Sequence, residues 1–92
     1  MALLSDSEIE ARLAAADGWE RRGADIVKDF ERGDFVGSVD FVSKLVAPAE
    51  AMNHHPDLEV SWGTVTVKIT THFEGGLTAA DFELAARIDG VA

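Results

Sequence analysis

The alternation of apolar and polar positions divides the chain into three predicted helices and four predicted strands. Apolar residues recur every third or fourth position in the helical segments and every second position in the extended ones. The predicted elements are a helix between Ser5 and Gly18, strands at Trp19–Arg21 and Ile26–Glu31, a helix at Phe35–Met52, strands at Leu58–Trp62 and Thr64–His72, and a helix at Ala79–Asp89. Strands joined by tight turns pair antiparallel, and amphipathic helices cover a sheet. The pattern therefore predicts one α+β domain over residues 1–92, with three helices packed on one face of a four-stranded antiparallel sheet.

Capping residues indicate where the helices begin and end. The predicted N-caps are Ser5, Asp34 and Thr78, with Glu8 and Asp81 three residues after the first and the last of them. A hydroxyl at the cap and a carboxylate three residues later satisfy free backbone N–H groups at a helix start. Gly18 and Gly90 are predicted to close the first and last helices.

The long central helix carries an apolar stripe and an internal proline. The stripe consists of Phe35, Val39, Val42, Val46 and Ala49, widened by Phe41 and Leu45. Spacings of four and three residues place such a stripe on one helix face, which we expect to pack on the core. Pro48 removes the hydrogen bond to the carbonyl of Lys44, so we expect a kink or a local opening of the last turns.

The two strands after this helix are predicted to form a β-hairpin with Gly63 in the turn. Apolar residues alternate with polar ones at Leu58, Val60 and Trp62, and again at Val65, Val67 and Ile69. Each strand is therefore expected to bury one face. Strict alternation places His72 on the opposite face from the valines, although a bulge near Thr70 would reverse it.

Composition limits the classes of partner. The 92 residues include 17 acidic and 8 basic ones, a formal charge of −9, and 47% are apolar. This balance argues against direct nucleic-acid binding, which depends on Lys and Arg, and favours a basic protein as any macromolecular partner. The apolar runs are far shorter than the ~20 residues that cross a bilayer, and the acidic, capped N-terminal segment does not resemble a signal peptide. With no Cys in the chain, we expect a cytoplasmic protein without disulfides and without a membrane anchor.

Candidate chemistry concentrates in residues 50–56, which read Glu-Ala-Met-Asn-His-His-Pro. Glu50 and His54 are four residues apart, so they share a helix face if the helix extends that far. Pro56 disfavours the helical conformation at His55. His54 is therefore expected on the last helical turn, and His55 at the start of an extended segment. Imidazoles change charge near neutral pH, which suits them to proton transfer.

These residues also have simpler interpretations. Two histidines beside a proline can be a solvated helix end, His72 can be a surface residue at a strand end, and Asp81 can serve only as a capping carboxylate. Zinc is a further alternative, and its acceptable ligands here are Glu50, His54, His55 and His72. No HExxH or comparable tight spacing supports it, so we predict no metal site. The chain has no Cys or Tyr nucleophile, no glycine-rich phosphate loop and no nucleophile elbow.

One ordered set of residues resembles the signature of the pterin-4a-carbinolamine dehydratases. The set is Glu50, His54-His55-Pro56, Trp62, His72 and Asp81, with gaps of three, five, nine and eight residues. The similarity extends over nearly the whole chain, and it includes Gly18-Trp19, Asn53 before the histidines, and Gly-Gly-Leu-Thr after the last histidine. Pro48 departs from the family pattern, which affects the expected orientation of Glu50.

The resemblance implies the α+β fold and dehydration of 4a-hydroxytetrahydrobiopterin to the quinonoid dihydropterin, which recycles the tetrahydropterin cofactor of aromatic amino-acid hydroxylases. It implies that His54 and His72 are the general acid and base in an undetermined order. It also implies that His55 binds or orients the pterin and shares in proton transfer. Glu50 and Asp81 would orient the imidazoles and tune their charge, and Asn53 and Trp62 would contact the substrate. The predicted reaction needs no cofactor. The family implies homodimers or homotetramers, and a non-enzymatic dimerisation module for a transcription factor is the alternative function.

Overall fold

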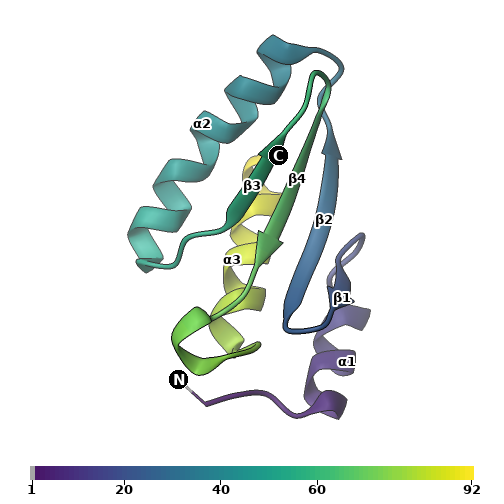
Figure 1. Cartoon of the computed structure of the whole chain (residues 1–92), viewed down its shortest axis with the longest axis vertical. Helices are drawn as coiled ribbons and strands as arrows, with labels where there is room; N and C mark the ends of the chain where they lie inside the picture. The colour runs from purple at the N-terminus through teal and green to yellow at the C-terminus, as the bar shows by residue number, and fades with distance from the viewer. Residues whose placement is uncertain (1) are drawn as a thin grey trace.

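The computed structural model describes residues 2–92 as one antiparallel sheet with helices on one side (Figure 1). The elements are α1 (Asp6–Ala14), β1 (Glu20–Arg22), β2 (Asp25–Glu31), α2 (Phe35–Met52), β3 (Asp57–Val60), β4 (Thr64–Ile69), the 3₁₀ turn η1 (His72–Glu74) and α3 (Ala79–Val91). The strand order is β1-β2-β4-β3, so β1 and β3 are the edges. α2 and α3 cover the sheet, and α1 lies at its end beside β1 (Figure 1). The predicted α+β class and element order are confirmed.

The predicted N-caps are confirmed, whereas the predicted glycine stops are wrong. Ser5 with Glu8 and Thr78 with Asp81 both form complete capping boxes, and the Asp34 side chain accepts the N–H of Gly37. α1 ends at Ala14, four residues before Gly18. α3 continues through Gly90 to Val91. Glycine favours a helix end but does not require one, and packing of the preceding turns decides the outcome.

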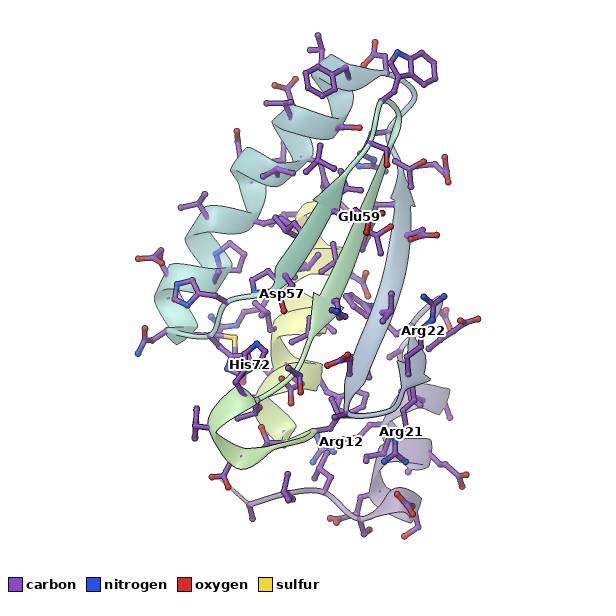
Figure 2. The ribbon with its side chains drawn as sticks, in the orientation of Figure 1. Arg12, Arg21, Arg22, Asp57, Glu59 and His72 are labelled. Carbon is purple, nitrogen blue, oxygen red and sulfur yellow. The ribbon has the colours of Figure 1, made fainter. Side chains whose placement is uncertain are left out.

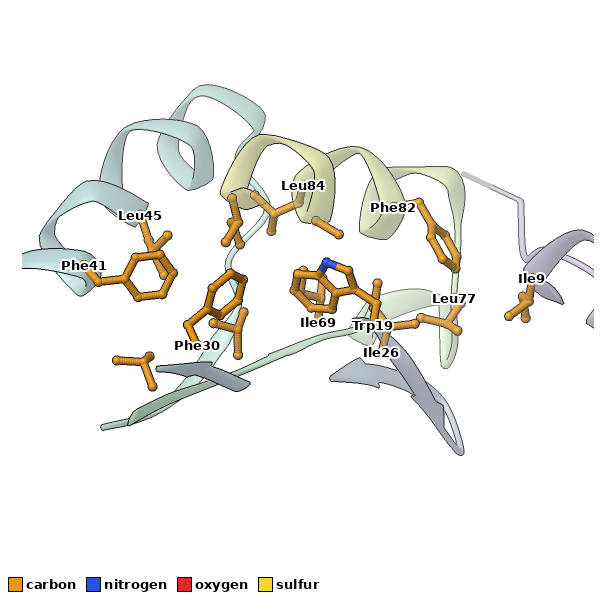
Figure 3. Packing of buried hydrophobic residues seen from close by; sticks show 14 residues of the cluster. Ile9, Trp19, Ile26, Phe30, Phe41, Leu45, Ile69, Leu77, Phe82 and Leu84 are labelled. Atoms are coloured by element: carbon orange, nitrogen blue, oxygen red, sulfur yellow. The ribbon is translucent and has the colours of Figure 1, made fainter. Parts of the chain in front are cut away.

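The core lies between the inner face of the sheet and the helices (Figure 3). Ile26 on β2 pairs with Ile69 on β4, and both are fully buried. Above them, α3 contributes Leu84 and α2 contributes Phe41. The prediction that β4 buries one face is confirmed, because Val65, Val67 and Ile69 are all fully buried.

Only part of the predicted apolar stripe of α2 faces this core: Ala49, Phe41 and Leu45 do, whereas three other members do not. The buried residues of α2 are Ser38, Phe41, Leu45, Pro48 and Ala49. Phe35, Val39 and Val46 have exposed fractions of 56, 43 and 59%. Two apolar stripes lie side by side on this helix, and the orientation of the helix on the sheet selects the one through Phe41. α2 remains helical through Pro48 to Met52, so the predicted local opening does not occur.

β3 also lacks the buried face that its alternation predicted. Leu58 and Val60 are exposed, and all four residues of the strand are accessible. β3 is an edge strand, so it has a neighbouring strand on one side only. Both hairpin strands are shorter than predicted, because β3 ends at Val60 and β4 ends at Ile69. Among residues 2–92, no helix has the length and apolar content needed to cross a membrane.

Candidate active site

The C-terminus of α2 determines where the two adjacent histidines lie. Asn53 adopts the left-handed conformation, with φ 48° and ψ 43°. Its N–H donates to the carbonyl of Glu50 (3.2 Å), and the N–H of His54 donates to the carbonyl of Ala49 (3.1 Å). These two bonds form a Schellman motif, which ends the helix and turns the chain. His54 therefore lies just beyond α2, and the expectation that it occupies the last helical turn is wrong.

His54 is paired with a buried carboxylate from α3. Its Nε2 lies 2.6 Å from Oδ1 of Asp81, and the exposed fractions of the two side chains are 11 and 0%. Oδ2 of Asp81 accepts hydrogen bonds from the Thr71 hydroxyl and from the backbone N–H of Thr78, both at 2.8 Å. Asp81 thus closes the capping box of α3 and holds His54 at the same time.

Glu50 contacts His55 and not His54. Oε2 of Glu50 lies 2.5 Å from Nε2 of His55, and both side chains are more than half exposed. The predicted pairing of Glu50 with His54 assumed a continuous helix. Because Asn53 reverses the backbone, His54 turns toward α3 and His55 takes the position beside Glu50.

His72 opens the turn η1 beyond the end of β4, so strand alternation does not determine its side. Its Nε2 lies 3.6 Å from Oδ2 of Asp57, the first residue of β3, and Figure 2 shows the two side by side. Its side chain is 73% exposed. Asp57 was not among the predicted site residues. The hairpin register pairs Asp57 with Lys68, so counting back from the turn could have placed it near the residues that follow β4.

The three imidazole–carboxylate pairs lie at one end of the sheet, where α2 ends, β3 begins and β4 ends (Figure 1). An open cavity of about 370 Å³ adjoins His54. Its lining residues are Ala51, Met52, Asn53, His54, Thr71, Phe73, Ala80, Glu83 and Arg87. This volume falls in the range of small-molecule pockets, roughly 300–1,000 Å³. No three His, Asp or Glu side chains within residues 2–92 form a group that could hold a metal ion.

The predicted site residues are thus only partly brought together. Asn53 lines the cavity beside His54. Trp62 follows β3 at the hairpin turn and is 72% exposed, so the whole length of β3 separates it from His55. Sequence reasoning also missed Thr71 and identified Thr78 only as a helix cap, because only the fold shows that their hydroxyls meet beside Asp81.

The family model described as pterin 4 alpha carbinolamine dehydratase matches residues 2–91. The chain belongs to this family. A protein of Roseiflexus castenholzii, provisionally named as such a dehydratase, is 47% identical over 90 residues, which are 98% of this chain and 97% of the relative. The expected resemblance is confirmed, and with it the prediction of an enzyme of the hydro-lyase class.

Solved structures share the fold of this dehydratase family member. A Brucella melitensis protein described as a transcriptional coactivator/pterin dehydratase superposes with a TM-score of 0.93 at 30% identity, covering 99% of both chains. A pterin dehydratase-like protein described as a RuBisCO assembly factor of the alpha-carboxysome superposes with a TM-score of 0.65 at 23% identity, covering 80% of this chain and 86% of its own. At that identity, the second similarity concerns the fold alone.

Proposed function

We propose that this protein dehydrates 4a-hydroxytetrahydrobiopterin to the quinonoid dihydropterin by histidine acid–base catalysis, and so recycles the tetrahydropterin cofactor. The observation that carries the proposal is the pairing of His54 with the buried Asp81 at the edge of an open cavity. A cytoplasmic location and the absence of a cofactor remain predictions from the sequence.

The reaction requires two proton transfers that balance. A base removes a proton from a pterin ring nitrogen, an acid protonates the 4a-hydroxyl, and water leaves as the carbon–nitrogen double bond forms. One imidazole enters the cycle neutral and one enters protonated, and the exchange returns the same total charge. Histidine suits both roles near neutral pH, because its ordinary pKa is about 6.5.

The contacts support different roles for the three histidines. His54 is the ordered member, because its buried partner fixes the ring. His72 is exposed beside Asp57 and is free to meet a substrate hydroxyl or ring nitrogen. We assign these two as the acid–base pair and His55, held by Glu50, as the residue that orients the pterin. Asn53 and Trp62 remain predicted substrate contacts.

The test is a coupled assay in which a phenylalanine hydroxylase generates the 4a-hydroxypterin, and its decay is followed with and without this protein. Replacing His54 or His72 by Ala is expected to lower the enzymatic rate by about 10²-fold. Arg21→Ala is a matched control, because Arg21 contacts Asp6 at the opposite side of the sheet. Unchanged rates in both histidine variants would contradict the assignment.

The exposed apolar residues of α2 support the predicted homo-oligomer. Phe35, Val39 and Val46 are four and seven residues apart, which is the spacing of one face in helix–helix seams. A second copy fits this face, because an antiparallel pair places Phe35 of each copy opposite Val46 of the other. Such a contact uses the same patch on both subunits and closes by two-fold symmetry. The accessible apolar residues of edge strand β3 add a second surface for association.

Sedimentation equilibrium tests this assembly. Val46→Glu would place a charge in the seam, and it is expected to shift the protein toward monomer. Ala47→Glu changes the adjacent exposed residue of the same helix, which lies outside the stripe, and is expected to leave the mass unchanged. A wild-type protein that sediments as a monomer at micromolar concentration would contradict the proposal.

A non-enzymatic interaction module is the second candidate function. The description of the Brucella melitensis protein joins a coactivator role to a dehydratase one, and the same α2 stripe offers an apolar surface to a partner. A wild-type protein that is inactive on the 4a-hydroxypterin, and that forms a stoichiometric complex with a purified basic partner protein, would favour this alternative.

A further inference from the structure

The hydrogen bonds around Asp81 have a defined direction. The Thr71 and Thr78 hydroxyls lie 2.9 Å apart, and the Thr78 hydroxyl also accepts backbone N–H groups at the start of α3. Thr71 in turn donates its single hydrogen to Oδ2 of Asp81 at 2.8 Å. Oδ2 also accepts the backbone N–H of Thr78. Each hydroxyl carries one hydrogen, so the chain of donors runs from Thr78 through Thr71 to Asp81.

These contacts bear on which nitrogen of His54 faces the cavity with a free lone pair. Oδ2 of Asp81 accepts two donors, so Oδ1 is the oxygen that pairs with Nε2 of His54, and a carboxylate there accepts from an Nε2–H. In that arrangement the exchangeable position of the ring is Nδ1. Nδ1 makes no hydrogen bond to any other residue among residues 2–92, and His54 borders the open cavity.

We infer that Nδ1 of His54 is the atom that exchanges a proton with the substrate, and that Thr71 is the residue that positions the Asp81–His54 pair for this exchange. The inference rests on the proposed function and names the atom that performs it. In the reaction Nδ1 gains or loses one proton, and the opposite transfer falls to the second catalytic group.

The place of Thr71 in the fold adds to its positioning role. It lies between the end of β4 and η1, where its backbone pairs with Gly76, and its side chain is fully buried. The next residue along the chain is His72. Thr71 is thus linked to His54 through Asp81, and it directly precedes His72 in the chain.

Three substitutions separate this role from a merely structural one. Thr71→Val keeps the shape but removes the hydroxyl, and it is expected to lower kcat about tenfold with KM changed less than about twofold, because ring orientation rather than substrate contact is lost. Thr71→Ser restores the donor and is expected to recover kcat to within about threefold of wild type. Thr70→Val is the control, since the Thr70 hydroxyl donates to the carbonyl of Ala24 and has no link to His54. It is expected to keep the wild-type kcat.

Nitrogen NMR of the imidazole rings provides a readout independent of activity. In ¹⁵N-histidine-labelled protein, at a pH where His54 is neutral, long-range ¹H–¹⁵N correlations are expected to show a protonated Nε2 and an unprotonated Nδ1. An Nδ1–H tautomer, or a Thr71→Val variant with wild-type kcat, would overturn the inference while leaving the dehydratase function intact. A wild-type protein without dehydratase activity would overturn the proposed function, whatever tautomer His54 shows.

Discussion

The buried pair of His54 and Asp81 predicts that one catalytic substitution also destabilises the protein. In His54→Ala, Oδ1 of Asp81 loses its hydrogen-bond donor in a site where the carboxylate has no exposed surface. A hydrogen bond to a charged group contributes about 1.5–3 kcal/mol, so we expect the free energy of unfolding to fall by about 2 kcal/mol. For a domain of this size, 1 kcal/mol shifts Tm by roughly 4–8 °C, which gives a fall of roughly 8–16 °C.

His72→Ala is the matched control for this effect. His72 is mostly exposed and lies 3.6 Å from an exposed Asp57, and such pairs contribute little because water and salt screen them. Its free energy of unfolding is expected to stay within about 0.5 kcal/mol of wild type.

Urea denaturation of the two variants, followed by circular dichroism and repeated by thermal melts, measures the difference between them. Activity assays of His54→Ala should be carried out at a temperature well below its lowered Tm, so that loss of catalysis is not confused with unfolding. Equal stability of the two variants would refute the reasoning, because it would mean that Asp81 does not depend on His54 for a partner.

Three further predictions concern α1 and α2. Ser38 is fully buried, and its hydroxyl has no hydrogen-bond partner among residues 2–92. Ser38→Ala is therefore expected to raise the free energy of unfolding by about 1 kcal/mol more than Ser43→Ala does. Ser43 is the comparison because its hydroxyl donates to a carbonyl of its own helix. Asn53→Ala is expected to cost about 1 kcal/mol in urea denaturation, and Asn53→Gly close to nothing, because only the alanine is strained at positive φ. The backbone N–H and the hydroxyl of Ser5 lower the pKa of Glu8 below its ordinary 4.5, so the capping carboxylate stabilises the fold above that pH. The stability difference between wild type and Glu8→Ala, measured by urea denaturation across pH, is expected to disappear as the pH falls through the lowered pKa.

Local physics accounts for what the sequence predicted correctly. The N-caps at Ser5, Asp34 and Thr78 were predictable because a cap is decided by residues three positions apart. The bounds of α2 agree with the prediction at both ends. The antiparallel pairing within the two hairpins followed from their short connections, and the family resemblance followed from fixed gaps between a few chemically distinctive residues.

The errors about which faces of α2 and β3 are buried share one cause. Burial of a side chain depends on which neighbouring element it faces, and the sequence pattern of one element does not contain that information. Periodicity identified the Val39 stripe as apolar, but only the orientation of α2 on the sheet shows that Phe41 faces the core and Val39 does not. Likewise, β3 alternates as a half-buried strand does, yet its place at the edge leaves both faces accessible.

The sequence by itself determined the elements, their order along the chain and the set of candidate catalytic groups. Tertiary structure alone decided how those groups pair. One residue in the left-handed conformation, Asn53, turns His54 toward Asp81 and leaves His55 to Glu50. The packing of the segment between β4 and α3 brings Thr71 and Thr78 together beside Asp81, where the Thr71 hydroxyl donates to the carboxylate. Spacing along a chain determines which residues share an element, whereas the pairing of an acid with its partner depends on how separate elements pack.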